Sequence, residues 1–178
     1  MFRRKQMSPQ EEMKRQLHAV AQNVIADGYD VYLFEGDDRR LPYMHTIGLP
    51  VIGIPDILVV GYIRDQLIDT FLDLHHTWLV GRSDGGLVPH VPGSPQMALV
   101  PCSSKAAHAM NVGAIVTAGL RPNHPPADYP ACQLLVQTPD GCWPWDKSNQ
   151  QRNASLILDA CPDAQSLVEN WLAADRAA

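Results

Sequence analysis

Apolar residues recur at three- and four-residue steps near the start of the chain, the spacing of one face of an amphipathic helix. The positions are Met13, Leu17, Val20, Ala21, Val24 and Ile25. Ser8-Pro9-Gln10-Glu11 precedes them in the form of a capping box with proline at the first helical position. Gly28 follows Asp27, where a left-handed cap is expected. The pattern predicts a helix that ends at Asp27, behind a disordered tail of residues 1–7.

Two β-branched and aromatic segments come next. Tyr29–Phe34 and Tyr43–Leu49 flank the turn sequence Gly36-Asp37-Asp38, which predicts an antiparallel hairpin with a polar, exposed loop. Ile57–Val60 is apolar throughout and bounded by turn residues, as is typical of a central strand covered on both faces. Further strands are predicted over Met97–Pro101 and Cys132–Thr138.

Helices and loops alternate with these strands. Apolar side chains at helical spacing predict a helix over Arg64–Val80. Glycine and proline dominate Arg82–Gln96, so we expect a surface loop there. The remaining segments are a helix from Ser103 or Ser104 to Met110, an ambiguous apolar stretch over Val112–Leu120, a proline-rich loop over Arg121–Pro130, and two short helices within Lys147–Ala178.

Together these elements predict a single α+β domain with a mostly antiparallel central sheet flanked by helices. We assign residues 8–148 to its core and residues 149–178 to a C-terminal helical extension of the same domain. The length of 178 residues suits one compact domain. The composition, 46% hydrophobic and 19% charged, is typical of a globular chain and excludes wholesale disorder.

Charge and hydropathy narrow the class of partner. The formal net charge is −5, whereas a surface that tracks phosphates carries more positive charge, so we expect no nucleic-acid partner. No stretch approaches the roughly 20 apolar residues of a membrane span, and the basic start lacks the apolar segment of a secretory signal. We therefore expect a soluble, cytoplasmic protein.

Its four cysteines are expected to be reduced, because a chain of this size needs no disulfide framework.

Two segments, Tyr43–Leu49 and Gln133–Asp146, are the parts least like a generic core. Trp143 and Trp145 flank a proline, and a buried indole N–H needs a partner. One interpretation is an aromatic wall that stacks on a planar ligand or a partner side chain, with Asp146 orienting it. The other is a structural corner that closes the sheet. His45 is either a general base, since imidazole titrates near neutral pH, or a structural residue of its strand. The candidate ligand-binding residues are His45, Trp143, Trp145 and Asp146.

Three segments of the chain share their order with a known family. The segments are Tyr43–Leu49, Pro55–Gly61 and Gln133–Asp146. This order resembles the bacterial family catalogued as domain of unknown function 4262, whose members carry Tyr-Thr-(Ile/Val)-Gly-Leu, Pro-Glu-Leu and Gln-aliphatic-Asp-Gly-aromatic-Pro-Trp blocks. The likeness covers roughly Gly28 to Asp146. His45 stands where the family usually has tyrosine, and Asp56 replaces the commoner glutamate. The resemblance implies a bacterial protein and brings no established activity.

Signatures of catalysis and metal binding are sparse. His75 and His76 are adjacent on a predicted helix and point about 100° apart, which is wrong for joint metal ligation. The cysteines form no Cys-x-x-Cys pair. We expect no metal and no cofactor. Cys102 precedes a predicted helix start, where the macrodipole would lower the pKa of its thiol, and His108 lies further along that helix; a buried structural cysteine is the alternative.

These observations favour a non-enzymatic module that binds a small molecule or a protein. As its setting we hypothesise an accessory role in a defence, toxin-neutralising or stress system, although no residue indicates this setting. Its cleft would be lined by aromatic side chains near His45, Trp143 and Trp145. The alternative is a small enzyme of unassigned class that uses His45, Cys102 or His108 in the same cleft, with the loop 82–96 closing over it. A homodimer with exposed tryptophans at its interface fits the same residues.

Overall fold

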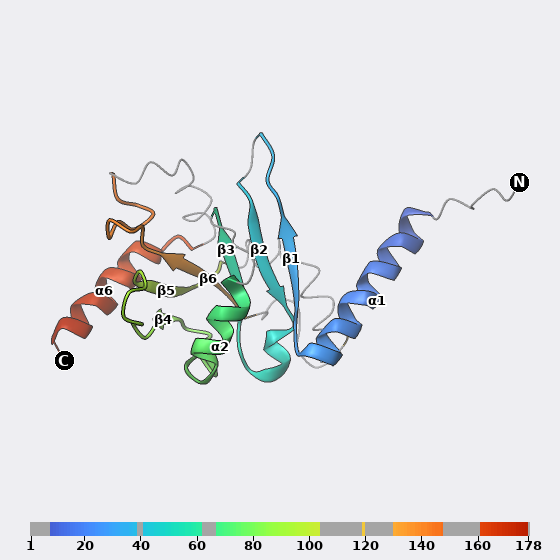
Figure 1. Cartoon of the computed structure of the whole chain (residues 1–178), viewed down its shortest axis with the longest axis horizontal. Helices are drawn as coiled ribbons and strands as arrows, with labels where there is room; N and C mark the ends of the chain where they lie inside the picture. Colours follow the sequence, from blue (N-terminus) through green and yellow to red (C-terminus); the bar gives the residue numbers. More distant parts are fainter. Residues whose placement is uncertain are drawn as a thin grey trace, which may run out of the picture.

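A six-stranded sheet organises the fold (Figure 1). The computed structural model of the chain describes residues 8–38, 41–61, 67–103, 119, 130–147 and 161–177. The strands, in the spatial order β1-β2-β3-β6-β5-β4, are β1 (Asp30–Phe34), β2 (Tyr43–Ile47), β3 (Asp56–Val60), β6 (Ala131–Val136), β5 (Met97–Pro101) and β4 (Gly86–Leu87). Neighbouring strands are antiparallel except β3 and β6, which run parallel. The predicted α+β class and mostly antiparallel sheet are confirmed.

Helix α1 (Pro9–Asp27) has the predicted start and end. Ser8 Oγ accepts a hydrogen bond from the amide of Glu11, whose carboxylate in turn accepts one from the amide of Ser8. Gly28 ends the helix in the left-handed region at φ 87°. Figure 1 shows that the helix meets the body of the protein at its C-terminal end and extends away from β1 toward its N-terminus.

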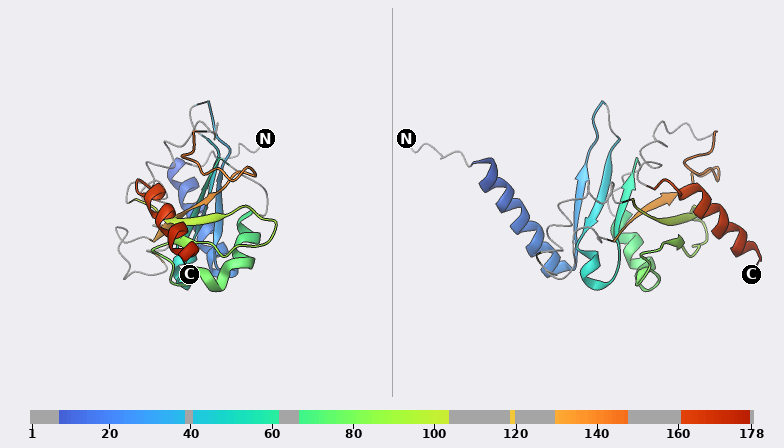
Figure 2. Two further views of the ribbon diagram at one scale, coloured as in Figure 1. Left: turned by 90° about the vertical axis from the view of Figure 1, so that its left-hand side faces the viewer. Right: turned by 180° about the vertical axis from the view of Figure 1, so that it is seen from behind.

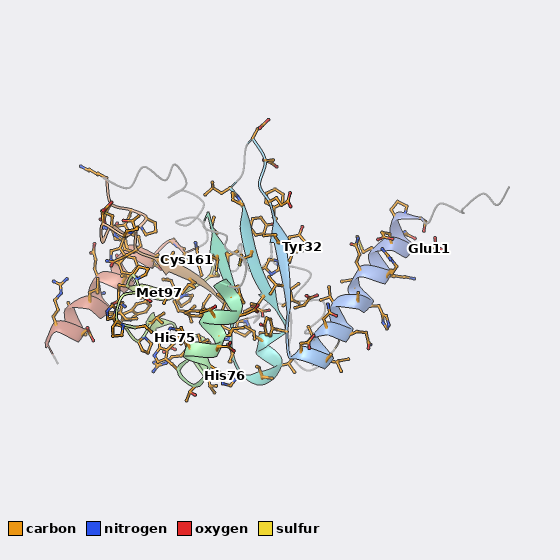
Figure 3. The ribbon with its side chains drawn as sticks, viewed as in Figure 1. Glu11, Tyr32, His75, His76, Met97 and Cys161 are labelled. Carbon is orange, nitrogen blue, oxygen red and sulfur yellow. The ribbon has the colours of Figure 1, made fainter. Side chains whose placement is uncertain are left out.

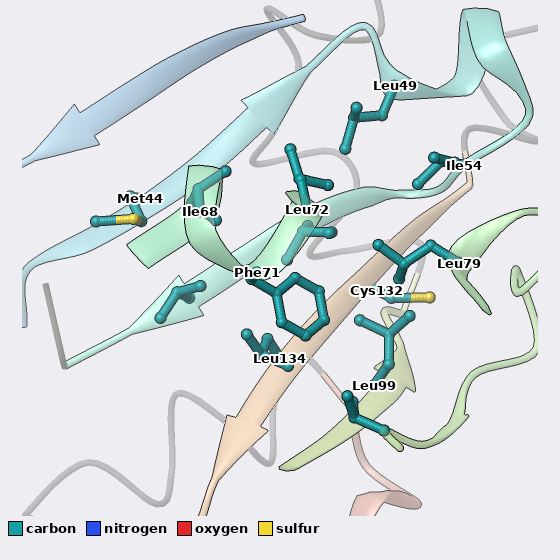
Figure 4. Packing of buried hydrophobic residues seen from close by; sticks show 13 residues of the cluster. Met44, Leu49, Ile54, Ile68, Phe71, Leu72, Leu79, Leu99, Cys132 and Leu134 are labelled. Carbon is teal, nitrogen blue, oxygen red and sulfur yellow. The ribbon is translucent and has the colours of Figure 1, made fainter. Parts of the chain in front are cut away.

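The larger core lies on the face of the sheet that carries helix α2 (Leu67–Leu79), which we call the α2 face (Figure 4). Side chains of β2, β3, β6 and β5 that point to this face pack against Ile68, Phe71 and Leu72. The strand residues are Met44, Ile57, Val59, Leu134 and Leu99. Burial of this cluster is the main apolar contribution to stability.

The opposite face carries helix α6 (Ala164–Ala177) over β4 and β5, and we call it the α6 face. Ala164 and Val168 pack there against Ala98, Val100 and Leu135. Val24 of α1 covers Ile47 on the same face, beside the β1–β2 hairpin. In the left-hand view of Figure 2, α2 and α6 lie on opposite sides of the sheet. The predicted C-terminal helix is therefore present over Ala164–Ala177 and packs on the sheet.

The prediction of a surface loop over residues 82–96 is wrong in one part. Gly86 and Leu87 form β4, which pairs with Leu99 and Ala98 of β5, and Val88 is buried in the larger core. The glycines that suggested a loop serve close approach instead. A Cβ at Gly85 would collide with the backbone carbonyl of Leu99, so the absence of a side chain is what lets this edge form.

Most other predicted elements are present with shifted ends. The second strand stops at Ile47, and a 3₁₀ helix, η1 (Leu49–Ile52), follows where we expected the strand to continue. The predicted tail 1–7, the beginning of the helix over 64–80, the segments 104–110 and 112–120 except Gly119, the loop 121–129 and the first C-terminal helix near residues 156–158 lie outside the described residues. Within the described part of the chain, no helix is long and apolar enough to span a membrane.

Candidate functional site

A cleft opens where the parallel strands β3 and β6 separate. Their pairing runs from Asp56 opposite Ala131 to Leu58 opposite Gln133. Beyond that point the two strands border a cavity of about 250 Å³ instead of each other. Its lining consists of Val59, Val60, Pro95, Gln133, Leu134, Leu135, Val136, Gln137, Thr138, Pro139 and Pro144.

The cleft lies along strand edges and not on one face of the sheet. Successive residues of a strand point to opposite faces, yet every residue from Gln133 to Pro139 borders the cavity, as do both Val59 and Val60. A cavity that touches all of them must lie in the plane of the sheet, beside the backbone. Peptide N–H and C=O groups that β3 and β6 would otherwise exchange are therefore part of its wall.

The order of strands and helices also points to this cleft as a ligand site. The next described helix after β3, α2, lies on one face of the sheet, and the next described helix after β6, α6, lies on the other. Two adjacent parallel strands whose following helices cover opposite faces define a switch point, and open sheets bind ligands in the crevice at the carboxyl ends of such strands. The cleft sits at those carboxyl ends.

Trp143, Trp145 and Asp146 form one compact corner beside the cleft. The two indole rings stack with centroids 5.5 Å apart and planes 12° apart. Asp146 Oδ2 accepts a hydrogen bond from the backbone amide of Trp143 at 2.6 Å, and the amide of Asp146 donates to the Trp143 carbonyl. Trp143 is 6% exposed and packs with Ala98, Leu135 and α6. Pro144, which lies between the two tryptophans in the sequence, is the residue of this corner that lines the cleft.

His45 lies on β2, away from that corner. Its register partners are Tyr32 on β1 and Leu58 on β3, and Leu58 in turn pairs with Gln133. Two strand spacings, about 10 Å, thus separate His45 from Gln133. The ring is buried, stacks near Tyr32 and Tyr43, and donates from Nδ1 to the carbonyl of Thr46 at 3.1 Å. Burial lowers its pKa, so the imidazole is neutral at neutral pH.

Cys102 has a partner other than histidine. Its sulfur lies 4.0 Å from that of Cys161, and this hydrogen bond together with burial raises the pKa of the Cys102 thiol. Both effects oppose the thiolate that the enzyme hypothesis invoked, and the helix predicted beyond Ser103 lies outside the described residues. Between the described residues, no hydrogen bond joins Cys102 to His45. His108 lies outside the described residues.

A buried polar cluster, missed by the sequence reasoning, fixes the end of β2. Asp56 is fully buried, and its carboxylate accepts hydrogen bonds from the Thr46 hydroxyl at 2.9 Å, the Gly48 amide at 3.2 Å and the Leu49 amide at 3.1 Å. Thr46 Oγ1 accepts one from the Ile57 amide. Burial raises the pKa of Asp56 to about 8, against the hydrogen bonds, which lower it.

A comparison of the sequence with known protein families identifies the family of this chain. The model of a family described as domain of unknown function (DUF4262) matches residues 23–150, which is most of the chain. The chain belongs to this family. No curated protein and no solved structure gave a significant match.

The three sequence segments that this chain shares with the DUF4262 family contribute to two different features of the structure. Thr46, Gly48, Leu49 and Asp56, from the first two blocks, make the buried cluster that holds the β2–β3 turn. The late block, from Gln133 onward, forms one wall of the cleft and the tryptophan corner. The second block also contributes Val59 and Val60 to the opposite wall of the cleft, so the candidate site is built from the second and the late block.

Sequence reasoning identified the corner but not the cavity. None of His45, Trp143, Trp145 or Asp146 belongs to the lining of the cleft, whereas Gln133 and Pro144, which do, lie in the distinctive segment Gln133–Asp146 but were not proposed as site residues. The signal that points to them is the run of seven consecutive lining residues, which becomes visible only once the strands are placed. Across the described ranges, no group of three or more His, Cys, Asp or Glu side chains is arranged to hold a metal ion.

Proposed function

We propose that this protein is a non-enzymatic binding module whose ligand occupies the cleft between β3 and β6. The observation that carries the proposal is the chemistry of the wall. Among the described residues that line the cavity, none has an ionisable side chain. General acid–base catalysis and nucleophilic catalysis by side chains need such groups next to the reacting atoms, whereas reversible binding does not.

The wall indicates a neutral ligand with both apolar and amide-like groups. Val59, Val60, Leu134 and Leu135 supply apolar surface, and Gln133 and Gln137 supply side-chain amides. The strand edges add backbone donors and acceptors in the plane of the sheet. Pockets that combine apolar surface with a few placed hydrogen-bonding groups are the usual form of small-molecule sites. A peptide-like amide that lies extended along β6 matches this wall best.

A fragment screen by ligand-observed NMR tests the proposal. The library holds neutral amides, short capped peptides and charged metabolites, and hits are repeated on two single variants. Gln137→Trp fills the cleft, whereas Gln16→Trp adds the same ring to an exposed site on α1. We expect neutral amides to bind the native chain and the Gln16 variant and to lose binding in the Gln137 variant. Binding confined to charged metabolites, or unaffected by Gln137→Trp, contradicts the proposal.

A second copy of the chain is another proposed partner, and the exposed edge strand β1 supports it. β1 is an edge strand, and its central residues Val31, Tyr32 and Leu33 are 38%, 44% and 47% exposed. An antiparallel edge that pairs with its own copy closes a twofold dimer. Trp143 is buried, so the interface through exposed tryptophans has no basis at that residue.

Light scattering of the purified chain tests the dimer. Leu33→Lys places a charge at the centre of the β1 edge, and Leu74→Lys, at an exposed leucine of α2, is its matched control. We expect a dimer in the native chain and the Leu74 variant and a monomer in the Leu33 variant. A native chain that is monomeric at high micromolar concentration rules the dimer out.

A further inference from the structure

Two free cysteines meet where β5 ends and the approach to α6 begins. Cys102 directly follows β5, Cys161 precedes α6 by three residues, and their sulfur atoms are 4.0 Å apart. The sulfurs of a disulfide are about 2.05 Å apart, so the two atoms need to approach by about 2 Å. Cys102 is partly exposed, whereas Cys161 is 1% exposed. Cys102 is therefore the less buried residue of the pair, and Cys161 (labelled in Figure 3) is the more buried one.

The buried thiol also touches the wall of the cleft. Cys161 Sγ lies 3.7 Å from Gln133 Oε1 and 3.8 Å from the carbonyl of Val100, within hydrogen-bonding distance for sulfur. Gln133 is itself buried and lines the cavity between β3 and β6. The thiol proton of Cys161 is thus a donor available to the side chain that supplies an amide to the proposed ligand site.

We propose that Cys102 and Cys161 are a redox modification site, in which a small-molecule disulfide such as oxidised glutathione converts the pair into an intramolecular disulfide and thereby changes the Gln133 amide in the cleft. The formation of the disulfide stands on the geometry of the two sulfurs alone. Its effect on ligand affinity rests on the function proposed above.

The reaction balances as a double thiol–disulfide exchange. Cys102, the less buried residue of the pair, loses its proton and attacks one sulfur of oxidised glutathione, which forms a mixed disulfide and releases one glutathione thiol. Cys161 then attacks the Cys102 sulfur, the protein disulfide forms, and the second glutathione leaves with the proton of Cys161. Two protein thiols are oxidised and one glutathione disulfide is reduced to two thiols. Because the raised pKa of Cys102 limits the first step, its rate increases with pH.

Oxidation removes a hydrogen-bond donor from the cleft wall. A Cys161 sulfur bonded to Cys102 has no proton to give, so Gln133 Oε1 loses that donor. The freed carbonyl oxygen is then available to a donor on the ligand, and the side chain takes a new orientation. We therefore expect the reduced and oxidised proteins to differ at the Gln133 amide even when no ligand is present.

The experiment uses the full chain and oxidised glutathione, followed by acid quenching, intact mass measurement and peptide mapping. We expect a loss of two hydrogen masses, mapped to Cys102 and Cys161 and reversed by dithiothreitol. Cys102→Ser and, separately, Cys161→Ala abolish it, whereas Cys142→Ser, a thiol outside the pair, retains it. Only mixed disulfides, bridges to Cys142, or no mass loss at about pH 8.5, where more of the thiol is ionised, would overturn the site.

A second readout tests the link to the cleft without a ligand. In the ¹H–¹⁵N spectrum, the side-chain amide of Gln133, assigned with Gln133→Glu, is expected to shift on oxidation of the native chain and to stay unchanged in Cys102→Ser. A disulfide that forms without this shift overturns the link. Ligand binding to the reduced protein reports on the proposed function separately, so the failure of one idea is distinguishable from the failure of the other.

Discussion

The hydroxyl of Thr46 donates to the carboxylate of Asp56 at 2.9 Å while it accepts the amide of Ile57, so one side chain ties β2 to β3 through two hydrogen bonds. The same carboxylate holds the amides of Gly48 and Leu49 at the start of η1. A buried backbone amide without a partner costs about 1–3 kcal/mol. Asp56 is therefore a structural acceptor, and its raised pKa reports burial at a turn.

Asp56→Asn is expected to alter the dependence of stability on pH. The folded pKa of about 8 lies above the ordinary value of 3.8, so the folded state binds a proton that the unfolded state has released. The contribution of Asp56 is fully present below pH 4 and is lost as the pH rises through 8. We expect the variant to be less stable by about 1–3 kcal/mol at pH 5 and to show a flatter decline up to pH 9. Urea denaturation across this range measures both effects, and an unchanged slope contradicts the assignment.

Gly48→Ala is expected to be strongly destabilising. The residue has φ 107°, and an added Cβ would lie 2.6 Å from Val24 Cγ1 of α1. Backbone strain and overpacking together predict a loss of about 3 kcal/mol. Gly53→Ala is the matched control, because its φ is 83° with nothing within 4 Å of the added atom, and strain alone predicts about 1 kcal/mol. Equal losses in the two variants would show that α1 does not pack on Gly48.

The tryptophan corner is expected to be structural as well as adjacent to the cleft. Trp143→Ala removes a buried ring from the cluster under α6 and is expected to cost about 3–5 kcal/mol. Asp146→Ala removes the acceptor of the Trp143 amide, for about 1.5–3 kcal/mol. Trp145→Ala, at a partly exposed ring, is expected to cost less than either. Denaturation midpoints measure all three, and a larger loss at Trp145 than at Trp143 is the contrary result.

Protonation of His45 is expected to oppose folding. Its folded pKa is lowered from the ordinary 6.5 by burial, so the unfolded state takes up the proton first as the pH falls. Stability that is present above pH 6.5 is then lost below it. His45→Gln is expected to lose less stability than the native chain between about pH 7 and 5. Parallel curves for the native chain and the His45 variant contradict this assignment.

Periodic segments of the sequence predicted the architecture closely. The capping box at Ser8 and the glycine after Asp27 fixed both ends of α1, because capping depends on neighbours in sequence. The strand over residues 56–60 was found because a continuous apolar run indicates burial on both faces. The strand over residues 30–34 was found from its β-branched and aromatic residues, although its central residues are exposed. β4 was missed because its glycines are required by the approach of Leu99, which is distant in sequence.

The candidate site was harder to predict because its wall forms where the neighbouring strands β3 and β6 stop pairing. Gln133 and Val60 border one cavity only because β3 and β6 separate after Leu58. No residue type marks such a point. Aromatic and titratable side chains drew attention to His45 and Trp143, whereas the cavity is lined by amides, prolines and aliphatic groups.

The short parallel pairing of β3 with β6 joins two antiparallel halves of the sheet, β1-β2-β3 and β6-β5-β4. Partners such as Asp56 and Ala131 come from distant parts of the chain, so the loop between them must close before their contact stabilises anything. The seam consists of three residue pairs, against five in the β1–β2 hairpin, so amides on either side of it are expected to exchange hydrogen ahead of those in the hairpin. A ligand that binds to both β3 and β6 would connect the two halves of the sheet beyond the point where these strands stop pairing.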